Sequence, residues 1–311
     1  MKGKILKILK AGQGIVSGEA ISAELGISRV SVWKHLQKLQ EFGYNIDASP
    51  RGYQLISSPD ALFPWEFPDR EKKIHFFPEV TSTMDIARDL ARKGCPHFTV
   101  VIAGCQNRGR GRLKRTWLSS QGGLYFTIIL RPQISPVLSL RVNFAASLIL
   151  AQTLNNMFDI DARVKWPNDI LIDGRKVSGI LSEIEAEADI VSFINVGLGI
   201  NVNNDPTRDE PKAVSLKQLS GSEISRKRLL SAFLNNFENC MNGKALDNII
   251  QEWKKYTVTL NRYVKIVTHH EVLEGVAVDL DENGALILEL ADGSTKKVLY
   301  GDCFHLQVDT E

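Results

Sequence analysis

A basic, glycine-containing segment between two apolar runs is the feature that most constrains this sequence. Residues 104–117 read Gly-Cys-Gln-Asn-Arg-Gly-Arg-Gly-Arg-Leu-Lys-Arg-Thr-Trp, so five of the residues 108–115 are Lys or Arg. The β-branched run 99–102 precedes this segment, and the apolar run 124–130 follows it. Both runs are typical of buried strands, so we expect the basic segment to form a long loop between two strands of a core sheet.

The composition of this basic loop suits anion binding. Glycine lets the backbone approach a ligand closely, and arginine presents a planar fork of donors to phosphate or carboxylate. Five like charges in so short a segment repel one another, so we expect the loop to be mobile until an anion neutralises it. A solvated basic loop would have the same composition, but the flanking core strands favour a phosphate-binding loop.

Composition and charge indicate a soluble globular protein of two or three domains. The chain has 311 residues, of which 43% are hydrophobic and 24% charged, as is ordinary for such proteins. Residues 1–58 hold eight Lys or Arg against four Asp or Glu, whereas residues 263–311 hold three against ten. This asymmetry predicts a basic N-terminal module joined to an acidic C-terminal one.

Cysteine spacing and hydropathy indicate a cytoplasmic protein. The four cysteines include no Cys-x-x-Cys pair, and the six histidines show no ligand spacing. We therefore expect neither a disulfide framework nor a metal site. No apolar run reaches about 18 residues, and the N-terminus lacks a signal-like apolar core, so no membrane association is expected.

The first 56 residues have the pattern of a winged helix-turn-helix. Helices are expected at residues 1–11, 19–25 and 29–42, followed by two short strands around a turn at residues 49–52. The third helix buries an apolar stripe and leaves a basic outer surface. The residues expected to contact DNA are Arg29, Ser31, Lys34 and Arg51. A small helical protein-interaction module is the alternative, and the local positive charge favours DNA.

Polar residues at the ends of predicted elements mark candidate site positions in the central region. Ser82 and Asp85 have capping-box spacing at the start of a helix, whose N-terminus is also a potential anion site. Residues 164–169 read as a strand that breaks at proline and places Asn168 and Asp169 at its end. Lys176 lies just past a hairpin turn, a position that is usually solvent-exposed.

The remaining pattern predicts an α+β protein. A long helix at residues 138–158 should cover the sheet, and the strand at 190–203 contains glycines that suggest close approach of backbone to ligand. Helices are expected at 226–242 and 245–256. Short alternating strands follow from residue 263 and predict a small SH3-like barrel, with an extension of the main sheet as the alternative. We predict domains at residues 1–62, 63–262 and 263–311.

Four motifs in this order resemble biotin protein ligase. The motifs are Gly109-Arg110-Gly111-Arg112-x-x-Arg115-x-Trp117, Lys165-Trp166-Pro167-Asn168-Asp169, Arg175-Lys176-Val177-Ser178-Gly179-Ile180-Leu181 and Gly197-x-Gly199-Ile200-Asn201. The winged helix makes the chain similar to the bifunctional form, which also represses the biotin operon. The resemblance covers essentially the whole chain and implies a central mixed sheet flanked by helices, similar to the catalytic domain of class II aminoacyl-tRNA synthetases.

The resemblance implies a two-step reaction. Biotin and ATP with Mg²⁺ give biotinyl-5′-adenylate and pyrophosphate, and biotin then passes to one lysine of the biotin carboxyl carrier domain of acetyl-CoA carboxylase. It also implies that the adenylate orders the basic loop and promotes a homodimer, which binds operator DNA.

The resemblance also assigns residues to roles. The biotin-binding set is Ser82, Thr83, Gln106, Gly109, Arg110, Trp117, Lys176 and Gly179. The ATP- and adenylate-binding set is Arg112, Arg115, Lys165, Asn168, Lys176 and Asn201. The catalytic set is Lys176, Arg110, Arg112 and Asp169. Fixed cations would offset the repulsion between a carboxylate and a triphosphate, and Asp169 would orient or deprotonate the incoming lysine.

Three positions depart from the family pattern. Met84 stands where a polar residue often follows Ser-Thr, Arg108 replaces a usually small residue, and Ala213 lies near where an aromatic often stacks on adenine. These departures change the contacts expected with the ligand. Three other functions also fit parts of the sequence: a lipoate ligase, a ligand-sensing regulator with an inactive enzyme domain, and a ligase that does not bind DNA.

Overall fold

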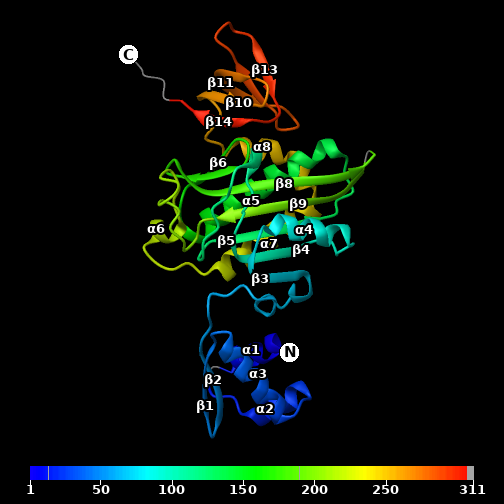
Figure 1. Ribbon diagram of the computed structural model, residues 1–311, viewed down its shortest axis with the longest axis vertical. Helices are drawn as coiled ribbons and strands as arrows, with labels where there is room; N and C mark the ends of the chain where they lie inside the picture. Colours follow the sequence, from blue (N-terminus) through cyan, green and yellow to red (C-terminus); the bar gives the residue numbers. More distant parts are fainter. Residues whose placement is uncertain (13, 189, 307–311) are drawn as a thin grey trace. The chain divides into compact units, whose positions relative to one another are not determined.

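The computed structural model describes residues 1–12, 14–188 and 190–306, which form two compact units, Met1–Ile74 and His75–Glu311. The first unit contains α1 (Lys2–Ala11), α2 (Gly18–Leu25), α3 (Arg29–Glu41) and a hairpin of β1 (Asn45–Ser49) and β2 (Gly52–Ser57) (Figure 1). Ser17 and Ser28 cap α2 and α3 by accepting backbone hydrogen bonds. These elements confirm the predicted winged helix-turn-helix.

Apolar spacing in the three helices creates the core of the first unit. Val32, Leu36 and Leu39 on α3 are buried against residues of α1 and α2. Residues that follow the hairpin also belong to this unit, because Phe63 and Trp65 pack against the same core and stack with ring centroids 4.6 Å apart. The segment at residues 57–68 resembles a linker in sequence but is packed in the structure. The domain boundary after residue 62 remains a prediction.

A seven-stranded sheet forms the centre of the second unit. Its strand order is β3-β4-β5-β9-β8-β7-β6. The strands are β3 (Ile74–Val80), β4 (Thr99–Gln106), β5 (Leu124–Leu130), β6 (Ala162–Lys165), β7 (Asp169–Ile172), β8 (Arg175–Glu187) and β9 (Ile190–Ile200). The antiparallel pair β4–β5 confirms that the basic loop joins two strands of a core sheet.

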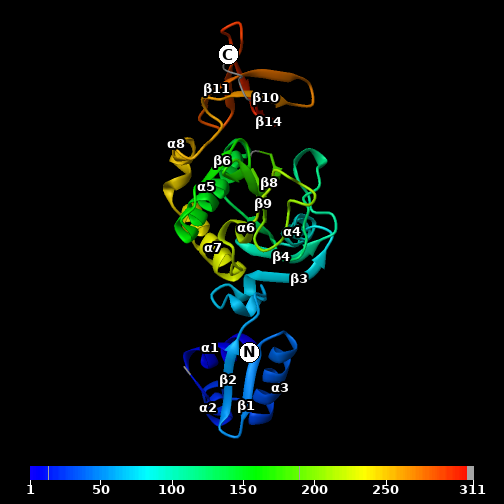
Figure 2. The same ribbon diagram turned by 90° about the vertical axis from the view of Figure 1, so that its left-hand side faces the viewer.

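Helices cover both faces of this sheet (Figure 2). On one face α4 (Thr83–Arg92) packs Ala87 and Ala91 against Val101, Ile129 and Phe193. The other face carries α5 (Ser139–Phe158), α7 (Arg226–Asn242) and α8 (Ile249–Lys254). Aromatic contacts between strands and helices, such as Phe126 with Phe233, join this helical layer to the sheet. The predicted α+β architecture is therefore confirmed.

The last 49 residues contain a separate five-stranded sheet in the order β13-β12-β11-β10-β14. The strands are β10 (Tyr263–Val267), β11 (Val272–Leu280), β12 (Leu286–Glu289), β13 (Thr295–Val298) and β14 (Asp302–His305). The alternative of an extension of the main sheet is thus wrong. The end of the predicted strand at residues 304–308 lies outside the described residues. The Trp166 indole joins the two sheets by donating to the Gly284 carbonyl at 3.1 Å.

Two predicted boundaries differ from the structure. The helix expected at residues 245–256 is a 3₁₀ turn, Lys244–Asn248, followed by the shorter α8. The strand expected at 190–203 ends at Ile200, where the chain enters the loop that leads to α6 (Leu216–Ser220). That loop has no simple periodicity, and it forms one wall of the site.

Candidate active site

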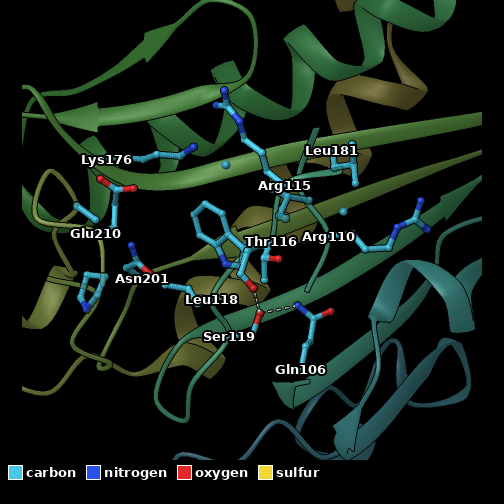
Figure 3. Close-up of a pocket in the computed structure, with 18 of the residues that line it drawn as sticks. Gln106, Arg110, Arg115, Thr116, Leu118, Ser119, Lys176, Leu181, Asn201 and Glu210 are labelled. Carbon is cyan, nitrogen blue, oxygen red and sulfur yellow. Dashed lines mark hydrogen bonds between the residues drawn. The ribbon is translucent and has the colours of Figure 1, made fainter. Parts of the chain in front are cut away.

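A cavity of about 540 Å³ lies over the strands that carry the sequence motifs (Figure 3). This volume is within the usual range for small-molecule sites. Predicted residues on its lining are Ser82, Thr83, Gln106, Arg110, Arg112, Arg115, Trp117, Asn168, Asp169, Lys176, Gly179 and Asn201. The basic loop, the β7–β8 hairpin and the start of α4 therefore meet at one place.

Lys176 lies near the start of β8 and is held by both strand and loop. Its backbone NH donates to the Lys212 carbonyl at 2.8 Å, and its carbonyl accepts from the Val214 NH at 2.9 Å. The ammonium Nζ lies 2.7 Å from Asp169 Oδ1 and 5.3 Å from the centroid of a Trp117 ring. Because an ammonium has three donors, Lys176 can pair with Asp169 and still donate to an anion in the cavity.

Two glycines form the surface on which the Trp117 indole lies. Gly179 and Gly199 face each other across β8 and β9. A Cβ atom at Gly199 would lie 2.3 Å from Trp117 Nε1, and one at Gly179 would lie 2.9 Å from Trp117 Cζ3. Similarly, a Cβ at Gly197 would lie 2.5 Å from the sulfur of Met84. We expected these glycines to admit a ligand, whereas in this structure they accommodate two side chains.

A chain of hydrogen bonds orients Gln106. Thr83 donates to Gln106 Oε1 from its backbone NH at 2.8 Å and from its hydroxyl at 3.1 Å. Gln106 Nε2 in turn donates to Ser119 Oγ at 2.8 Å (Figure 3). Buried Thr127 completes the chain by donating to Thr83 Oγ1 at 2.9 Å. Sequence reasoning missed Thr127 and Ser119 because single hydroxyl residues in or after a strand carry no motif signal.

Ser82 and Gly109 shape the backbone around the site. Ser82 is 1% exposed and caps α4 by accepting from the Met84 NH at 3.3 Å. The expected partner in a capping box, Asp85, instead binds Arg110. Gly109 does not line the cavity; a Cβ there would lie 2.3 Å from the Trp117 carbonyl oxygen. Its role is to allow the loop to fold back on itself.

Three arginines of the basic loop, Arg110, Arg112 and Arg115, are paired with carboxylates or carbonyls. Arg110 binds Asp85 at 2.9 Å and also Glu183. In Figure 3 its side chain extends to the side of the cavity opposite Lys176. The structure therefore does not place the Arg110 guanidinium beside Lys176, because Asp85 and Glu183 offer it two carboxylates.

The C-terminal sheet supplies partners to the other two arginines. Arg112 donates to Asn168 Oδ1 at 3.1 Å and to the Gly301 carbonyl at 3.2 Å, and Arg115 forms an ion pair with Asp302. Burial lowers the pKa of Arg112, and the charge of Asp302 opposes this effect. We expected the five positive charges of the basic loop to repel one another, and that expectation did not include these partners from other segments of the chain.

Two predicted asparagines on the lining of the cavity are held by hydrogen bonds. Asn168 Nδ2 donates to the Ile180 carbonyl at 2.6 Å, which fixes the turn before β7. Asn201 is 4% exposed and accepts from Asn204 Nδ2 at 3.0 Å. The loop after β9 adds wall residues that the sequence analysis did not assign to the site, namely Asn204, Asp205, Pro206, Asp209 and Glu210, beside Ala213.

Lys165 is not part of this cavity. It lines a neighbouring groove of about 650 Å³ between β6, β7 and β14, whose lining also includes Arg112, Arg115, Asp169 and Lys176. Lys165 is paired in register with Asp169 at the ends of β6 and β7. The side chain thus belongs to a basic groove that adjoins the cavity.

The predicted DNA-contacting residues belong to the other unit. Arg29, Ser31 and Lys34 lie on α3, and Arg51 lies in the turn between β1 and β2. Arg29, Lys34 and Arg51 are exposed, and Ser31 is half-buried. The structure therefore offers the helix and the wing tip as a basic surface.

In the described ranges, no three His, Cys, Asp or Glu side chains come together in a way that could hold a metal ion. None of the helices in the described part of the chain is both long and apolar enough to cross a membrane.

Comparison with known proteins identifies relatives along the whole length. The chain is 35% identical over 308 residues to the bifunctional ligase/repressor BirA of Bacillus spizizenii, covering 94% of each protein. It is 27% identical over 314 residues to BirA of Escherichia coli, covering 96% of this chain and 95% of that protein. The biotin protein ligase of Aquifex aeolicus, solved in complex with biotin and ATP, superposes with a TM-score of 0.65 at 28% identity, covering 76% of this chain and 99% of that one.

Family models match in the predicted order. Residues 2–54 match an HTH domain, residues 76–201 match the biotin/lipoate A/B protein ligase family, and residues 259–306 match the biotin protein ligase C-terminal domain. These matches and the site built around Lys176 confirm the resemblance seen in the sequence. The chain belongs to the biotin protein ligase family, in its bifunctional ligase/repressor form.

Proposed function

We propose that this chain, acting in the cytoplasm, joins biotin to ATP as biotinyl-5′-adenylate and then transfers biotin to a lysine of the biotin carboxyl carrier domain of acetyl-CoA carboxylase. The observation that carries this proposal is the Lys176–Asp169 pair, 2.7 Å apart, on the lining of the cavity beneath the basic loop. Residues 1–62, 63–262 and 263–311 are the proposed DNA-binding, catalytic and C-terminal domains.

Lys176 serves the first half-reaction. The biotin carboxylate and the α-phosphate of ATP are both anions, so a cation between them lowers their repulsion and stabilises the charge that develops on the phosphate. Lys176 is placed for this role because it is anchored through its backbone and retains free donors. Trp117 covers the nearby strands and, with the loop, excludes water from the mixed anhydride.

The polar residues around Gln106 bind the biotin ring system. Biotin presents a ureido group that both donates and accepts hydrogen bonds, and the cavity offers Ser82, Thr83 and Gln106 beside the backbone of the loop. Gln106 is held at both ends of its amide, by Thr83 and Ser119. A fixed amide orients a ligand at a lower entropic cost than a mobile one.

Asp169 serves the second half-reaction. Aminolysis requires a neutral lysine amine, and a carboxylate at hydrogen-bond distance can orient it and accept its proton. Asp169 can keep its pair with Lys176 and still accept from the acceptor amine, because a carboxylate has several acceptor sites. One pair of side chains thus serves both steps.

Magnesium would arrive with the nucleotide. Mg²⁺ keeps several waters and commonly uses one or two protein carboxylates beside the phosphates, and Asp169 and Glu210 are on the lining of the cavity. The ion would neutralise the pyrophosphate leaving group.

The adenylate-bound chain would be the repressor. We propose that adenylate binding promotes a homodimer whose two winged helices bind a two-part operator through Arg29, Ser31, Lys34 and Arg51. The basic surface of α3 and the match to an HTH domain support DNA binding, and order imposed on a loop can change the surface offered to a partner. Sedimentation with and without biotinyl-5′-adenylate tests this step, because an unchanged monomer at micromolar protein would contradict it.

Pyrophosphate release tests the ligase proposal. ATP and Mg²⁺ are supplied with biotin, with lipoate or with neither, and release is expected with biotin alone. Release with lipoate would identify lipoate as the substrate. If neither biotin nor lipoate causes release, the chain would be a ligand-sensing regulator with an inactive enzyme domain. Removal of Mg²⁺ with EDTA is expected to stop release in the biotin reaction.

A further inference from the structure

An exposed stripe on α3 combines apolar and basic side chains. Val30, Trp33, Lys34 and Gln37 are spaced i, i+3, i+4 and i+7, so they follow one another along one side of the helix. Val30 is 63% exposed and Trp33 is 47% exposed. The buried stripe of Val32, Leu36 and Leu39 faces the core instead, so the exposed stripe is not needed to hold the helix in place.

The two apolar side chains of this stripe are more exposed than that of Phe42, which follows α3. Phe42 is 39% exposed and packs its ring against Phe63 and Trp65 at centroid distances of 4.9 and 5.1 Å. Val30 and Trp33 lie in the first half of α3, among the cations predicted to contact DNA. Charge around an apolar contact surface indicates a polyanionic partner that also presents apolar groups.

Duplex DNA has such groups only in the major groove. The C5-methyl of thymine is the apolar feature by which a protein distinguishes thymine there, and aliphatic or aromatic side chains contact it directly. The N-terminal half of a recognition helix is the part that reaches base edges. Arg29 and Lys34 on the same helix and Arg51 in the turn between β1 and β2 are exposed and can hold phosphates.

We propose that Val30 and Trp33 read thymine methyl groups in the operator. The inference rests on the proposed repressor function and deepens it, because it assigns base recognition to two residues outside the predicted DNA-contacting set. Val30 and Trp33 provide sequence preference, while Arg29, Lys34 and Arg51 provide affinity that is nearly independent of sequence. Thymines at fixed positions of each half-site are therefore required.

The test uses the full-length protein with biotin, ATP and Mg²⁺. Duplexes that bind are first selected from a random library, and a selected duplex is then resynthesised with deoxyuridine replacing one thymidine at a time. This change removes only the methyl group and keeps the base-pairing and major-groove hydrogen-bonding groups. At the contacted positions, binding should weaken about fourfold per methyl, the factor that corresponds to burial of one CH₂-sized group.

Variants assign each methyl to a side chain. Val30→Ala and Trp33→Ala should each bind the thymidine duplex more weakly and lose sensitivity to deoxyuridine at one position. The matched control is Arg51→Ala, which should weaken binding to both duplexes by the same factor and flatten the salt dependence. Melting temperature and pyrophosphate release of the Val30 and Trp33 variants should match those of the unchanged protein.

Three results would overturn the inference. A selected duplex that tolerates deoxyuridine at every position would refute methyl recognition and leave the repressor proposal intact. Sensitivity that persists in both alanine variants would assign the methyl contacts to other residues. Selection of no duplex would remove the repressor function itself, and the stripe would then be a surface for a protein partner.

Discussion

Replacement of Lys176 by alanine should separate catalysis from stability. The Lys176 side chain is 33% exposed and that of Asp169 is 22% exposed. A pair that is so accessible to solvent contributes at most about 1 kcal/mol to the free energy of unfolding. For a folded unit the size of His75–Glu311, loss of the Lys176–Asp169 pair should lower the melting temperature by no more than about 4 °C.

The effect of Lys176→Ala on adenylate formation should be much larger. The ammonium is the fixed cation that we place between the biotin carboxylate and the α-phosphate. Loss of one preorganised group that stabilises developing charge typically lowers kcat about 10²- to 10³-fold, or about 2.7–4 kcal/mol. The difference between this loss and the small change in stability is what identifies a catalytic role.

The assay measures pyrophosphate release at saturating biotin and ATP, together with thermal unfolding of the same samples. Lys265→Ala is the matched control, because Lys265 forms an ion pair with Glu274 at 3.2 Å and its side chain is 41% exposed, but it lies on β10, away from the cavity. The control should retain normal rates. A rate within about threefold of normal for Lys176→Ala would refute our assignment, and a large loss of melting temperature would show that the lysine is structural.

Three other substitutions test the surroundings of this lysine. Asp169→Asn should form the adenylate at a rate within about tenfold of normal, but it should slow transfer from purified biotinyl-5′-adenylate to the acceptor by about 10²-fold or more. Equal losses of rate in both half-reactions would contradict a role specific to transfer. Gly199→Ala should lower the free energy of unfolding by about 1–3 kcal/mol and raise KM for biotin, because the added methyl displaces Trp117. Gly14→Ala is the control and should have neither effect, because the nearest atom to a Cβ there is 3.8 Å away. Burial lowers the pKa of His305 from 6.5 to about 4, so the unfolded chain binds more protons between these values. The contribution of His305 to stability is therefore complete above about pH 6.5 and is lost as the pH falls to about 4, by at most about 3 kcal/mol. His305→Gln should flatten the melting temperature across this range, and an unchanged profile would exclude His305 as the cause.

Local patterns in the sequence predicted elements that depend on near neighbours. Ser28 accepts from the Ser31 NH at 3.2 Å, as expected for a cap that acts three residues away. The β-branched run before the basic loop became β4 because each of its side chains fits a sheet buried on both faces. The loop after Asn201 was not predicted, because its bonds to Val177 and Leu216 join segments without common periodicity.

The sequence correctly indicated close approach at the glycine motif, but it did not indicate which atoms approach these glycines. Gly197 and Gly199 do mark a place where a Cβ cannot be accommodated, as the sequence indicated. The atoms that exclude the Cβ come from Met84 and Trp117, which lie more than 80 positions earlier in the chain. Met84, which departs from the family pattern, is buried because Gly197 leaves space for its sulfur.

The basic loop shows the same limit for charge. Its arginines repel one another when only the loop is considered, and for Arg110, Arg112 and Arg115 the repulsion is offset by partners that are distant in sequence. Arg110 reaches Asp85 across 25 positions and Glu183 across 73, and Arg112 reaches the carbonyl of Gly301 across 189. Because Coulomb interactions depend on distance in space, only the folded sheet defines which charges are neighbours. An anion that enters the cavity must therefore compete with these internal partners, so the affinity of the loop for phosphate depends on Asp85, Glu183 and the C-terminal sheet as well as on its own arginines.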